Sequence, residues 1–377
     1  MILNRAYSIA LSWLIIFITS CNSIAKKNIK NRNSMHWGIT KISSETGANS
    51  FDYEFNQYFI QDSLTGYIIG DNSIAEMYRS IIEKRVLKRE NYEAILFKTE
   101  DGGVSFRKRS LGKGSLQKIT SDNEKNLYVI QYNYKTASLP KRYRIMYSRD
   151  LGETWQEMAF PQGKKIETVQ FYNGLKGVVA IEEDGMFKLL KTKDGGKTWE
   201  ELPVKETSLN YYSIQFINEE ALYVYNSIGG FRQTATVNFT TGNVKIHNPN
   251  LPKGYQFSSF IKDDSTGSLY SEVSNYKEDH DLMLYNHQTN ELISYNIENS
   301  SEQYIIDVTV SGEYIGLLRA DKGIVSYYYS RDKGENWIRE KMPERLSESY
   351  AAMYGKGLVW VKSAFNLYNL QVRKMDN

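Results

Sequence analysis

The stretch Thr192-Lys193-Asp194-Gly195-Gly196-Lys197-Thr198-Trp199 indicates the fold of this chain, because variants of it recur along the sequence. We call the pattern the aspartate motif: a hydroxyl residue, an aspartate two positions later, a glycine two after that and an aromatic residue three further on. The other copies span residues 99–106, 148–155 and 330–337. Successive motif aspartates are separated by 49, 44 and 138 residues, and 138 is three steps of 46. A regular period of this length predicts a repeat architecture.

The longest gap between copies should therefore contain two weakened ones. Two turn-like stretches lie near the expected places, Thr240-Thr241-Gly242-Asn243 and His287-Gln288-Thr289-Asn290. Each stands between runs with the alternation of apolar and polar residues that predicts a β-strand. We interpret both as degenerate copies.

The residue types of the motif predict a hairpin turn. An aspartate accepts hydrogen bonds from the backbone of its own turn, and a glycine adopts the positive φ at which the chain reverses. The aromatic residue buries a large apolar area against the sheet. The motif residues are therefore predicted to be structural: Asp101, Gly103, Phe106, Asp150, Gly152, Trp155, Asp194, Gly196, Trp199, Asp332, Gly334 and Trp337.

A second repeat precedes each motif by one hairpin. Strand–turn–strand segments have their turns near residues 66, 126, 177, 221, 267, 313 and 357. The last segment lacks a fourth strand, and an unused strand-like run at residues 35–42 could supply it. We expect an all-β fold, a seven-bladed β-propeller of four-stranded antiparallel blades whose ring is closed by the N-terminal strand completing the last blade.

The N-terminus predicts export and a lipid anchor. Arg5 precedes an apolar run at residues 9–18, which is typical of a signal peptide rather than a membrane span. The run ends before Cys21, the single cysteine of the chain. We predict a signal peptide at residues 1–20, lipidation of Cys21, a flexible tether at 21–34 and one propeller domain at 35–377; an ordinary secretory signal with a chance cysteine is the alternative.

Composition and compartment constrain the partners. The formal net charge of the 377 residues is only +3, which argues against nucleic-acid binding. With the lipid anchor we expect the protein in the bacterial cell envelope, at the outer membrane and facing the periplasm, because no acidic run follows Cys21. We expect a monomer.

The repeated motifs and the hairpins between them resemble the BNR or Asp-box propellers over residues 55–340. The run from Leu190 to Trp199 looks most like the photosystem II assembly-factor type. The resemblance implies a propeller fold, and since related motifs occur in sialidases, receptors and glycan-active enzymes, it implies little about activity.

A sialidase-like activity is weakly supported by the sequence. In sialidases, arginines on the inner strands clamp the substrate carboxylate, and an Arg-Ile-Pro motif stands near the N-terminus. This chain has no Arg-Ile-Pro, and its expected inner strands hold no arginine, at residues 57–61, 116–120, 166–171, 212–216, 256–261, 305–310 and 350–354. We predict no catalytic residue, cofactor or metal site; a metal site at His280 and His287 is the alternative to a solvated loop there.

The longest connections should lie on one face of the propeller. In the first blade, residues 72–93 contain a short amphipathic helix, and residues 132–143 form the equivalent loop of the second blade. Together they predict a basic cluster of Arg79, Lys84, Arg85, Lys88, Arg89, Lys135, Lys141 and Arg142.

We predict a membrane-tethered, non-enzymatic binding or assembly propeller. It would recognise a protein or glycan partner, anionic if it docks on the basic cluster. The alternative is a glycan-active hydrolase or lyase that uses the central well.

Overall fold

The computed structural model describes residues 37–40, 53–134, 142–161, 164–204, 213–225, 234–263, 265–275, 282–295, 297, 303–321, 324–345, 350–354, 358–362 and 367–371. Two compact units are distinguished, Met1–His36 and Trp37–Asn377. The first unit lies outside the described residues, so the signal peptide, Cys21 and the tether stay predictions.

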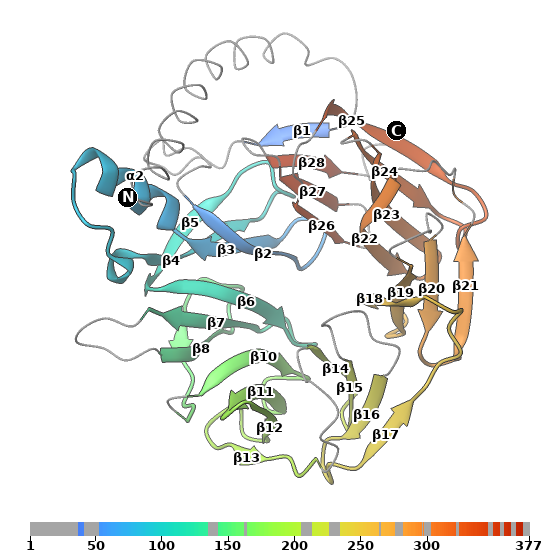
Figure 1. The fold of residues 1–377 in the computed structure, drawn as a ribbon, viewed down its shortest axis with the longest axis horizontal. Helices are drawn as coiled ribbons and strands as arrows, with labels where there is room; N and C mark the ends of the chain where they lie inside the picture. The colour runs from blue at the N-terminus through green and yellow to red at the C-terminus, as the bar shows by residue number, and fades with distance from the viewer. Residues whose placement is uncertain are drawn as a thin grey trace, which may run out of the picture. The chain divides into compact units, whose positions relative to one another are not determined.

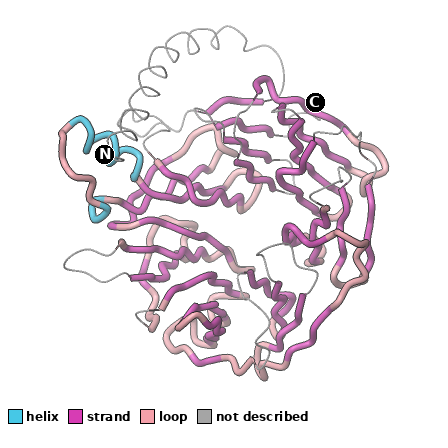
Figure 2. The backbone as a smooth tube through the Cα atoms, viewed as in Figure 1, coloured by secondary structure: helices cyan, strands magenta, loops and turns pink. Residues whose placement is uncertain are grey.

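Strands make up most of the described chain, and turns and loops make up nearly all of the rest (Figure 2). Within it, seven four-stranded antiparallel sheets are present. Blade 1 contains β2 (Glu54–Ile60), β3 (Gly66–Asp71), β4 (Glu93–Thr99) and β5 (Arg107–Lys113). Blade 2 contains β6 (Ser115–Ser121), β7 (Leu127–Asn133), β8 (Arg142–Ser148) and β9 (Gln156–Glu157). Blade 3 contains β10 (Lys165–Phe171), β11 (Gly177–Glu183), β12 (Met186–Thr192) and β13 (Glu200–Glu201).

The same order continues in the second half of the chain. Blade 4 contains β14 (Ser213–Asn218), β15 (Ala221–Tyr225), β16 (Thr234–Asn238) and β17 (Val244–His247). Blade 5 contains β18 (Gln256–Lys262), β19 (Leu269–Ser274), β20 (Leu282–Asn286) and β21 (Glu291–Tyr295). Blade 6 contains β22 (Gln303–Ser311), β23 (Tyr314–Asp321), β24 (Ile324–Ser330) and β25 (Ile338–Arg345).

The last sheet is built differently, and we call it the composite sheet. It joins β26 (Tyr350–Tyr354), β27 (Leu358–Lys362) and β28 (Leu367–Gln371) to β1 (Trp37–Thr40), which pairs antiparallel with β28. The prediction of a seven-bladed propeller is therefore wrong. Six blades are each folded from four consecutive strands, and the remaining four-stranded sheet is assembled from two distant parts of the chain.

The first strands of successive blades lie against one another (Figure 1). Contacts join β2 to β6, β6 to β10, β10 to β14, β18 to β22, and β22 to β26, and β26 also contacts β2. The apolar cores lie between blades rather than within them. One such core combines Val178 and Leu189 of blade 3 with Leu222 and Val237 of blade 4. Another combines Trp360 of the composite sheet with residues of blade 1.

The meander places the connections on two faces. The turns between first and second strands and between third and fourth strands share one face, which we call the hairpin face. The links between second and third strands and between blades share the other, the long-loop face. The helix predicted in the first blade is present there as α2 (Ser73–Ile82), followed by the 3-10 turn η2 (Arg89–Asn91).

Candidate functional site

The four aspartate motifs form the same hydrogen-bonded turn between a third and a fourth strand. In blade 3, the Thr192 hydroxyl donates to Asp194 Oδ1 over 2.8 Å and accepts the backbone N–H of Gly196 over 2.9 Å. Asp194 also accepts the backbone N–H and the hydroxyl of Thr198, over 2.9 and 2.6 Å. The bonds recur at Asp101, Asp150 and Asp332.

These bonds engage the carboxylates within their own turns. Hydrogen bonds from Thr154 hold the pKa of Asp150 at about 2. Those from Thr198 and Asn336 do the same for Asp194 and Asp332, whose pKa values are also about 2. A carboxylate stabilised so strongly in its ionised form is a poor proton acceptor. The geometry supports the structural interpretation of the motif.

The motif glycines also make room for the neighbouring blade. A Cβ atom on Gly103 would lie 2.5 Å from the Trp360 side chain of the composite sheet. On Gly196 it would lie 2.3 Å from Met158 of blade 2, and on Gly334 2.3 Å from Tyr295 of blade 5. All three glycines have positive φ. The sequence predicted the turn but not this second role, in which the motif joins two blades.

The degenerate copies use asparagine where the motif uses a hydroxyl and an aspartate. In blade 4, Asn238 Oδ1 accepts the backbone N–H groups of Thr240 and Thr241 over 3.0 and 2.8 Å. In blade 5, Asn286 Oδ1 accepts those of Gln288 and Thr289. Both asparagines end the third strand of their blade. Asn286 lies one position before its predicted stretch begins, and Asn238 lies two positions before.

The basic cluster predicted on the long-loop face is only partly a free charged surface. Arg79 and Arg85 both bind the buried carboxylate of Glu76, over 2.8 and 2.9 Å. Arg85 also pairs with Glu83 over 2.6 Å. Burial alone would raise the pKa of Glu76, but the hydrogen bonds from Arg85 and Arg79 outweigh it and lower that pKa. These two arginines hold the insertion together, so Arg85 is not a neutral position for charge reversal.

The other predicted residues divide into those that the structure brings together and those it leaves undescribed. Lys84, Lys88 and Arg89 are exposed on the same insertion, with Lys88 3.8 Å from Glu90. The guanidinium of Arg89 lies 5.8 Å from the ring of Tyr134 in blade 2. Lys135 and Lys141 lie outside the described residues, and only the backbone of Arg142, the first residue of β8, is described.

Sequence reasoning missed a series of bulges on the long-loop side of the first strands. The register shifts between Phe55 and Gln57 in β2, and at corresponding places in β6, β10, β18 and β22. A bulge re-aims one side chain and interrupts pairing locally. The bulged residues are Asn56, Gln117, Glu167, Ser258 and Ile306. The signal in the sequence was a pair of adjacent polar residues inside predicted strands, such as Gln117-Lys118 and Glu167-Thr168.

Blades 2 and 3 place charged groups at these bulges. Lys165 lies 2.5 Å from Glu167 and 2.8 Å from Glu182. Burial lowers the pKa of Lys118 on β6 to about 8, and the nearby charge of Glu167 opposes that shift. At neutral pH most of the Lys118 amine is therefore still protonated. We call Lys118, Lys165 and Glu167, with the bulged Asn56 and Gln117, the polar mouth.

Polar side chains near the mouth also tie the first strands together. Asn56 donates to Ser115 Oγ and to the Leu116 carbonyl, over 2.9 and 2.7 Å. Gln57 accepts the Ile119 backbone N–H over 2.9 Å. The mouth between blades 1 and 2 is thereby held in one geometry, which favours binding without prior rearrangement.

His287 takes part in a packed cluster between blades 4 and 5. Its Nδ1 lies 2.5 Å from the hydroxyl of Tyr223, and its Nε2 lies 2.8 Å from the hydroxyl of Ser271. The rings of Phe257 and Phe260 lie 5.4 Å from the imidazole. Burial lowers the pKa of His287 to about 3. His280 lies outside the described residues, so the alternative of a shared metal site is not tested there.

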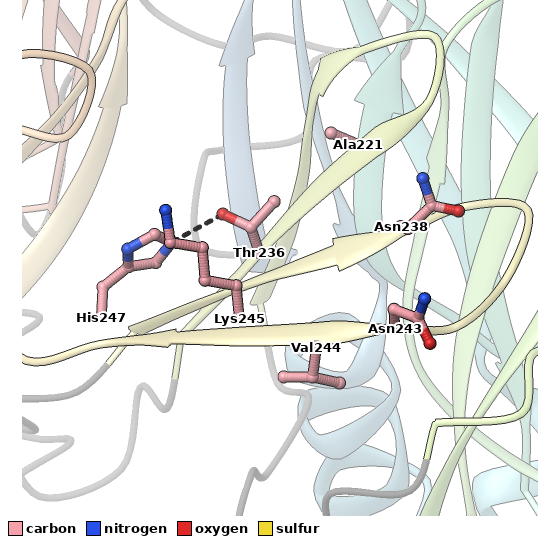
Figure 3. A pocket seen from close by; sticks show the side chains of 7 residues that line it. All are labelled: Ala221, Thr236, Asn238, Asn243, Val244, Lys245 and His247. Carbon is pink, nitrogen blue, oxygen red and sulfur yellow. Dashed lines mark hydrogen bonds between the residues drawn. The ribbon is translucent and has the colours of Figure 1, made fainter.

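A shallow groove with a free volume of about 350 Å³ lies on the outer strands of blade 4. Figure 3 shows His247 bonded to Thr236 at one end, over 2.7 Å, with Lys245 beside it. The groove is lined by Ala221, Thr236, Asn238, Asn243, Val244, Lys245 and His247. The lining residues include no pair of carboxyl groups of which one could act as a general acid and the other as a general base.

Two further features were sought in the described part of the chain. No group of three or more histidine, cysteine, aspartate or glutamate residues there has a geometry that could hold a metal ion. None of the helices described is both long enough and apolar enough to cross a membrane.

No family model matches this chain, and no curated protein matches it. Among solved structures, it is similar to YCF48 bound to D1 peptide, with a TM-score of 0.58 and 13% identity over 90% of this chain and 96% of that one. It is also similar to YCF48 from Cyanidioschyzon merolae, with a TM-score of 0.55 and 15% identity over 89% and 99%.

A third similar structure is the β-propeller domain of the Trilobed protease from Pyrococcus furiosus. Its TM-score is 0.50, with 11% identity over 84% of this chain and 95% of that one. Identities this low establish the fold alone, and the resemblance to Asp-box propellers stays a prediction. The chain is an all-β protein with the β-propeller fold.

Proposed function

We propose that this chain is a non-enzymatic binding or assembly propeller of the bacterial cell envelope, tethered by a lipid on Cys21, and that it recognises a segment of a protein partner. The observation that carries the proposal is the polar mouth, where successive blades present bulged side chains at one end of their first strands. The similarity to a YCF48 structure with a bound peptide supports a protein partner.

The chemistry of the mouth suits an extended polar segment. The Lys118 amine attracts a carboxylate, whereas Glu167 and the side-chain amides offer acceptors for backbone or amino groups. Charge-assisted hydrogen bonds of this kind are short and directional. The partner segment would therefore carry an acidic side chain or terminus beside uncharged polar groups.

The mouth is tested by affinity capture from detergent-solubilised envelope with the full chain as bait, followed by a binding constant for the captured partner. We expect Lys118→Met to weaken binding by about tenfold, which corresponds to losing one charge-assisted hydrogen bond. Lys193→Met is the matched control, because Lys193 is exposed and lies on the hairpin face. Equal affinity of both variants would contradict the proposed site.

Catalysis is tested separately with a broad glycoside panel and the purified chain. We expect no turnover above the level of a heat-denatured sample. Turnover that Glu167→Gln abolishes would replace the binding proposal with the glycan-active alternative, in which the mouth holds a substrate.

The tether is tested by Cys21→Ser. Because a thioether to diacylglycerol requires a thiol and Cys21 is the single cysteine, we expect the variant to leave the membrane fraction or to remain an uncleaved precursor. Fractionation and the intact mass of the mature chain report these outcomes. A mature wild-type chain whose intact mass contains no acyl group would remove the anchor from the proposal and leave the mouth unaffected.

A further inference from the structure

The helix α2 buries polar residues and exposes apolar ones. Its buried residues are Glu76 and Ser80, whereas Met77, Ile81 and Ile82 are exposed. An amphipathic helix on a globular protein normally buries its apolar side. The opposite orientation leaves a row of aliphatic side chains in solvent, which requires an explanation.

The orientation is held by specific contacts. Buried Glu76 binds both Arg79 and Arg85, so that the end of the insertion is clamped to the helix. At the base, Asn72 Oδ1 accepts the Glu93 backbone N–H over 2.7 Å, and this bond ties the two ends of the insertion together. The insertion also stands away from the β2–β5 sheet (Figure 1).

The helix ends in a tight turn, and two more exposed apolar residues follow it in the sequence. The Arg85 backbone N–H donates to the Ser80 carbonyl over 2.9 Å, and Lys84 between them has a φ of 51°. This is the Schellman type of helix end, usually made with glycine. Beyond it, Val86 is 79% exposed, as Ile82 is 78% exposed before it. We call the exposed aliphatic side chains the aliphatic ridge: Met77, Ile81, Ile82, Val86 and Leu87.

Cationic side chains flank the aliphatic ridge. Arg79, Lys84, Lys88 and Arg89 are exposed around it. Arg79 is also paired with Glu76, and Lys88 with Glu90. Residues 73–92 nevertheless carry five lysines and arginines against three glutamates, so the insertion has an excess of positive charge. A projecting aliphatic surface with lysines and arginines at its borders has the composition of a segment that lies in a membrane interface.

We propose that the aliphatic ridge inserts into the headgroup region of a lipid bilayer that contains anionic lipids. The charge of the flanking cations is complementary to such lipids. A protein partner would need a groove to receive a projecting ridge, whereas a bilayer accepts it without a shape of its own. The contact would orient the propeller on the membrane, with the long-loop face on the membrane side. It does not depend on lipidation of Cys21.

The test uses the full chain with Cys21→Ser, which removes both the lipid site and the native thiol. A single cysteine labelled with bimane is introduced either at Leu87 on the ridge or at Leu175, which is 58% exposed on the hairpin face. The label is read in vesicles of phosphatidylethanolamine and phosphatidylglycerol that carry a doxyl quencher on the acyl chain. We expect the Leu87 label to lose about half of its emission or more, and the Leu175 label to lose little.

One double variant and one single variant distinguish insertion of the ridge from non-specific membrane adsorption. Ile82→Asn with Val86→Asn should abolish quenching at position 87, because inserting each aliphatic side chain is worth about one power of ten in partition. Leu64→Asn with a label at position 87 is the control, since Leu64 is 56% exposed on the hairpin face. It should leave quenching unchanged. The melting temperature should stay constant in both variants because the substituted side chains are exposed.

Four outcomes would overturn the proposal: no quenching at position 87, equal quenching at positions 87 and 175, equal quenching in vesicles of phosphatidylcholine alone, or a dimer in light scattering that the ridge variant dissociates. The last outcome would assign the ridge to a second copy of this chain. Failure of the polar-mouth experiment would leave all four readouts unchanged, so the two proposals are tested independently.

Discussion

Blades 1, 2, 3 and 6 carry the complete aspartate motif, whereas blades 4 and 5 make the same turn with one asparagine. In the complete motif an ionised carboxylate and a hydroxyl together satisfy the backbone of the turn, as at Asp101 and Thr99. In blade 4 the neutral amide of Asn238 accepts the turn N–H groups alone. The comparison shows that this turn needs side-chain oxygens that accept its backbone N–H groups. The negative charge of the aspartate is not required for the turn to form.

The joints between blades differ in the same way. The motif glycine of blade 1 receives Trp360 from the composite sheet, and the motif aromatic Phe106 packs on the same ring at 5.4 Å. Between blades 4 and 5 the joint is instead the neutral imidazole of His287 among aromatic rings. The first joint contains no ionisable side chain, whereas the second contains a histidine whose pKa burial lowers from the ordinary value of 6.5 to about 3.

The largest effect is expected at the joint of blade 1. Trp360 is fully buried, and its Nε1 donates to the Gly102 carbonyl over 3.3 Å. Trp360→Ala should lower the free energy of unfolding by about 3–5 kcal/mol, because it removes a large side chain and leaves a cavity. Urea unfolding measures this. Trp155→Ala, at a partly exposed motif aromatic, should cost clearly less, and equal losses would contradict the role of Trp360 as a joint.

The next largest effect is a pH dependence of stability that arises at the His287 joint. Burial lowers the pKa of His287 from the ordinary value of 6.5 to about 3 in the folded protein. The unfolded chain therefore binds more protons between these values, and the free energy of unfolding should fall as the pH drops below about 6.5, by up to about 1.4 kcal/mol per pH unit.

Urea unfolding of wild type and His287→Gln at pH 7 and pH 5 checks this expectation. The variant should show a smaller loss on acidification, since glutamine does not titrate. His247→Gln is compared with it, because burial and Lys245 lower the pKa of His247 as well, and it should reduce the acid dependence by less than His287→Gln does. An equal acid dependence of wild type and His287→Gln would show that His287 does not make this joint sensitive to acid.

A direct test of the turns compares Asp101→Ala with Asn238→Ala. The first should cost about 1–3 kcal/mol, because hydrogen bonds to a charged acceptor are the stronger ones. The second should cost about 1 kcal/mol, since the acceptor is a neutral amide. Thermal unfolding at neutral pH measures both. The opposite order would mean that the carboxylate adds nothing to the turn.

The smallest effect on stability is expected for Asp150, and only at strongly acidic pH. Hydrogen bonds from Thr154 lower the pKa of Asp150 from 3.8 to about 2. Its contribution to stability is present above the unfolded value of 3.8, and it is lost as the pH falls through about 2. Asp150→Asn should reduce the acid dependence of the unfolding midpoint in that range and leave it unchanged at pH 7. Because Asp150 is exposed, only a small change is expected.

The fate of the predicted charged residues shows the limit of reasoning from spacing. A short amphipathic helix was predicted within residues 72–93, and α2 occupies Ser73–Ile82 of that range. The prediction of a joint basic surface was incomplete, because Arg79 and Arg85 turn toward Glu76. The amino-acid order shows where charges stand along the chain. Whether a charge is paired depends on how the chain folds around it, as Arg79 and Arg85 do around Glu76.

The bulged first strands show a similar limit. Gln117 and Glu167 stand in segments that were correctly predicted as first strands, whereas Asn56 lies one residue before the predicted segment 57–61 and within β2. Nothing in strand periodicity tells which residue will be left unpaired, since a bulge depends on the register of the neighbouring strand. The polar mouth could therefore not be recognised until the strands were paired.

The sequence by itself determined the repeat, the hairpin turns and the strand-like run near the N-terminus, because turn chemistry and alternation act between residues close in the chain. Only the tertiary structure decided that the motif glycines admit a side chain of the neighbouring blade, that six blades are contiguous and one sheet is composite, and that α2 exposes its apolar side. The physical reason is that each of these depends on contacts between residues far apart in sequence, such as Gly102 with Trp360, whose geometry exists only after the blades have packed.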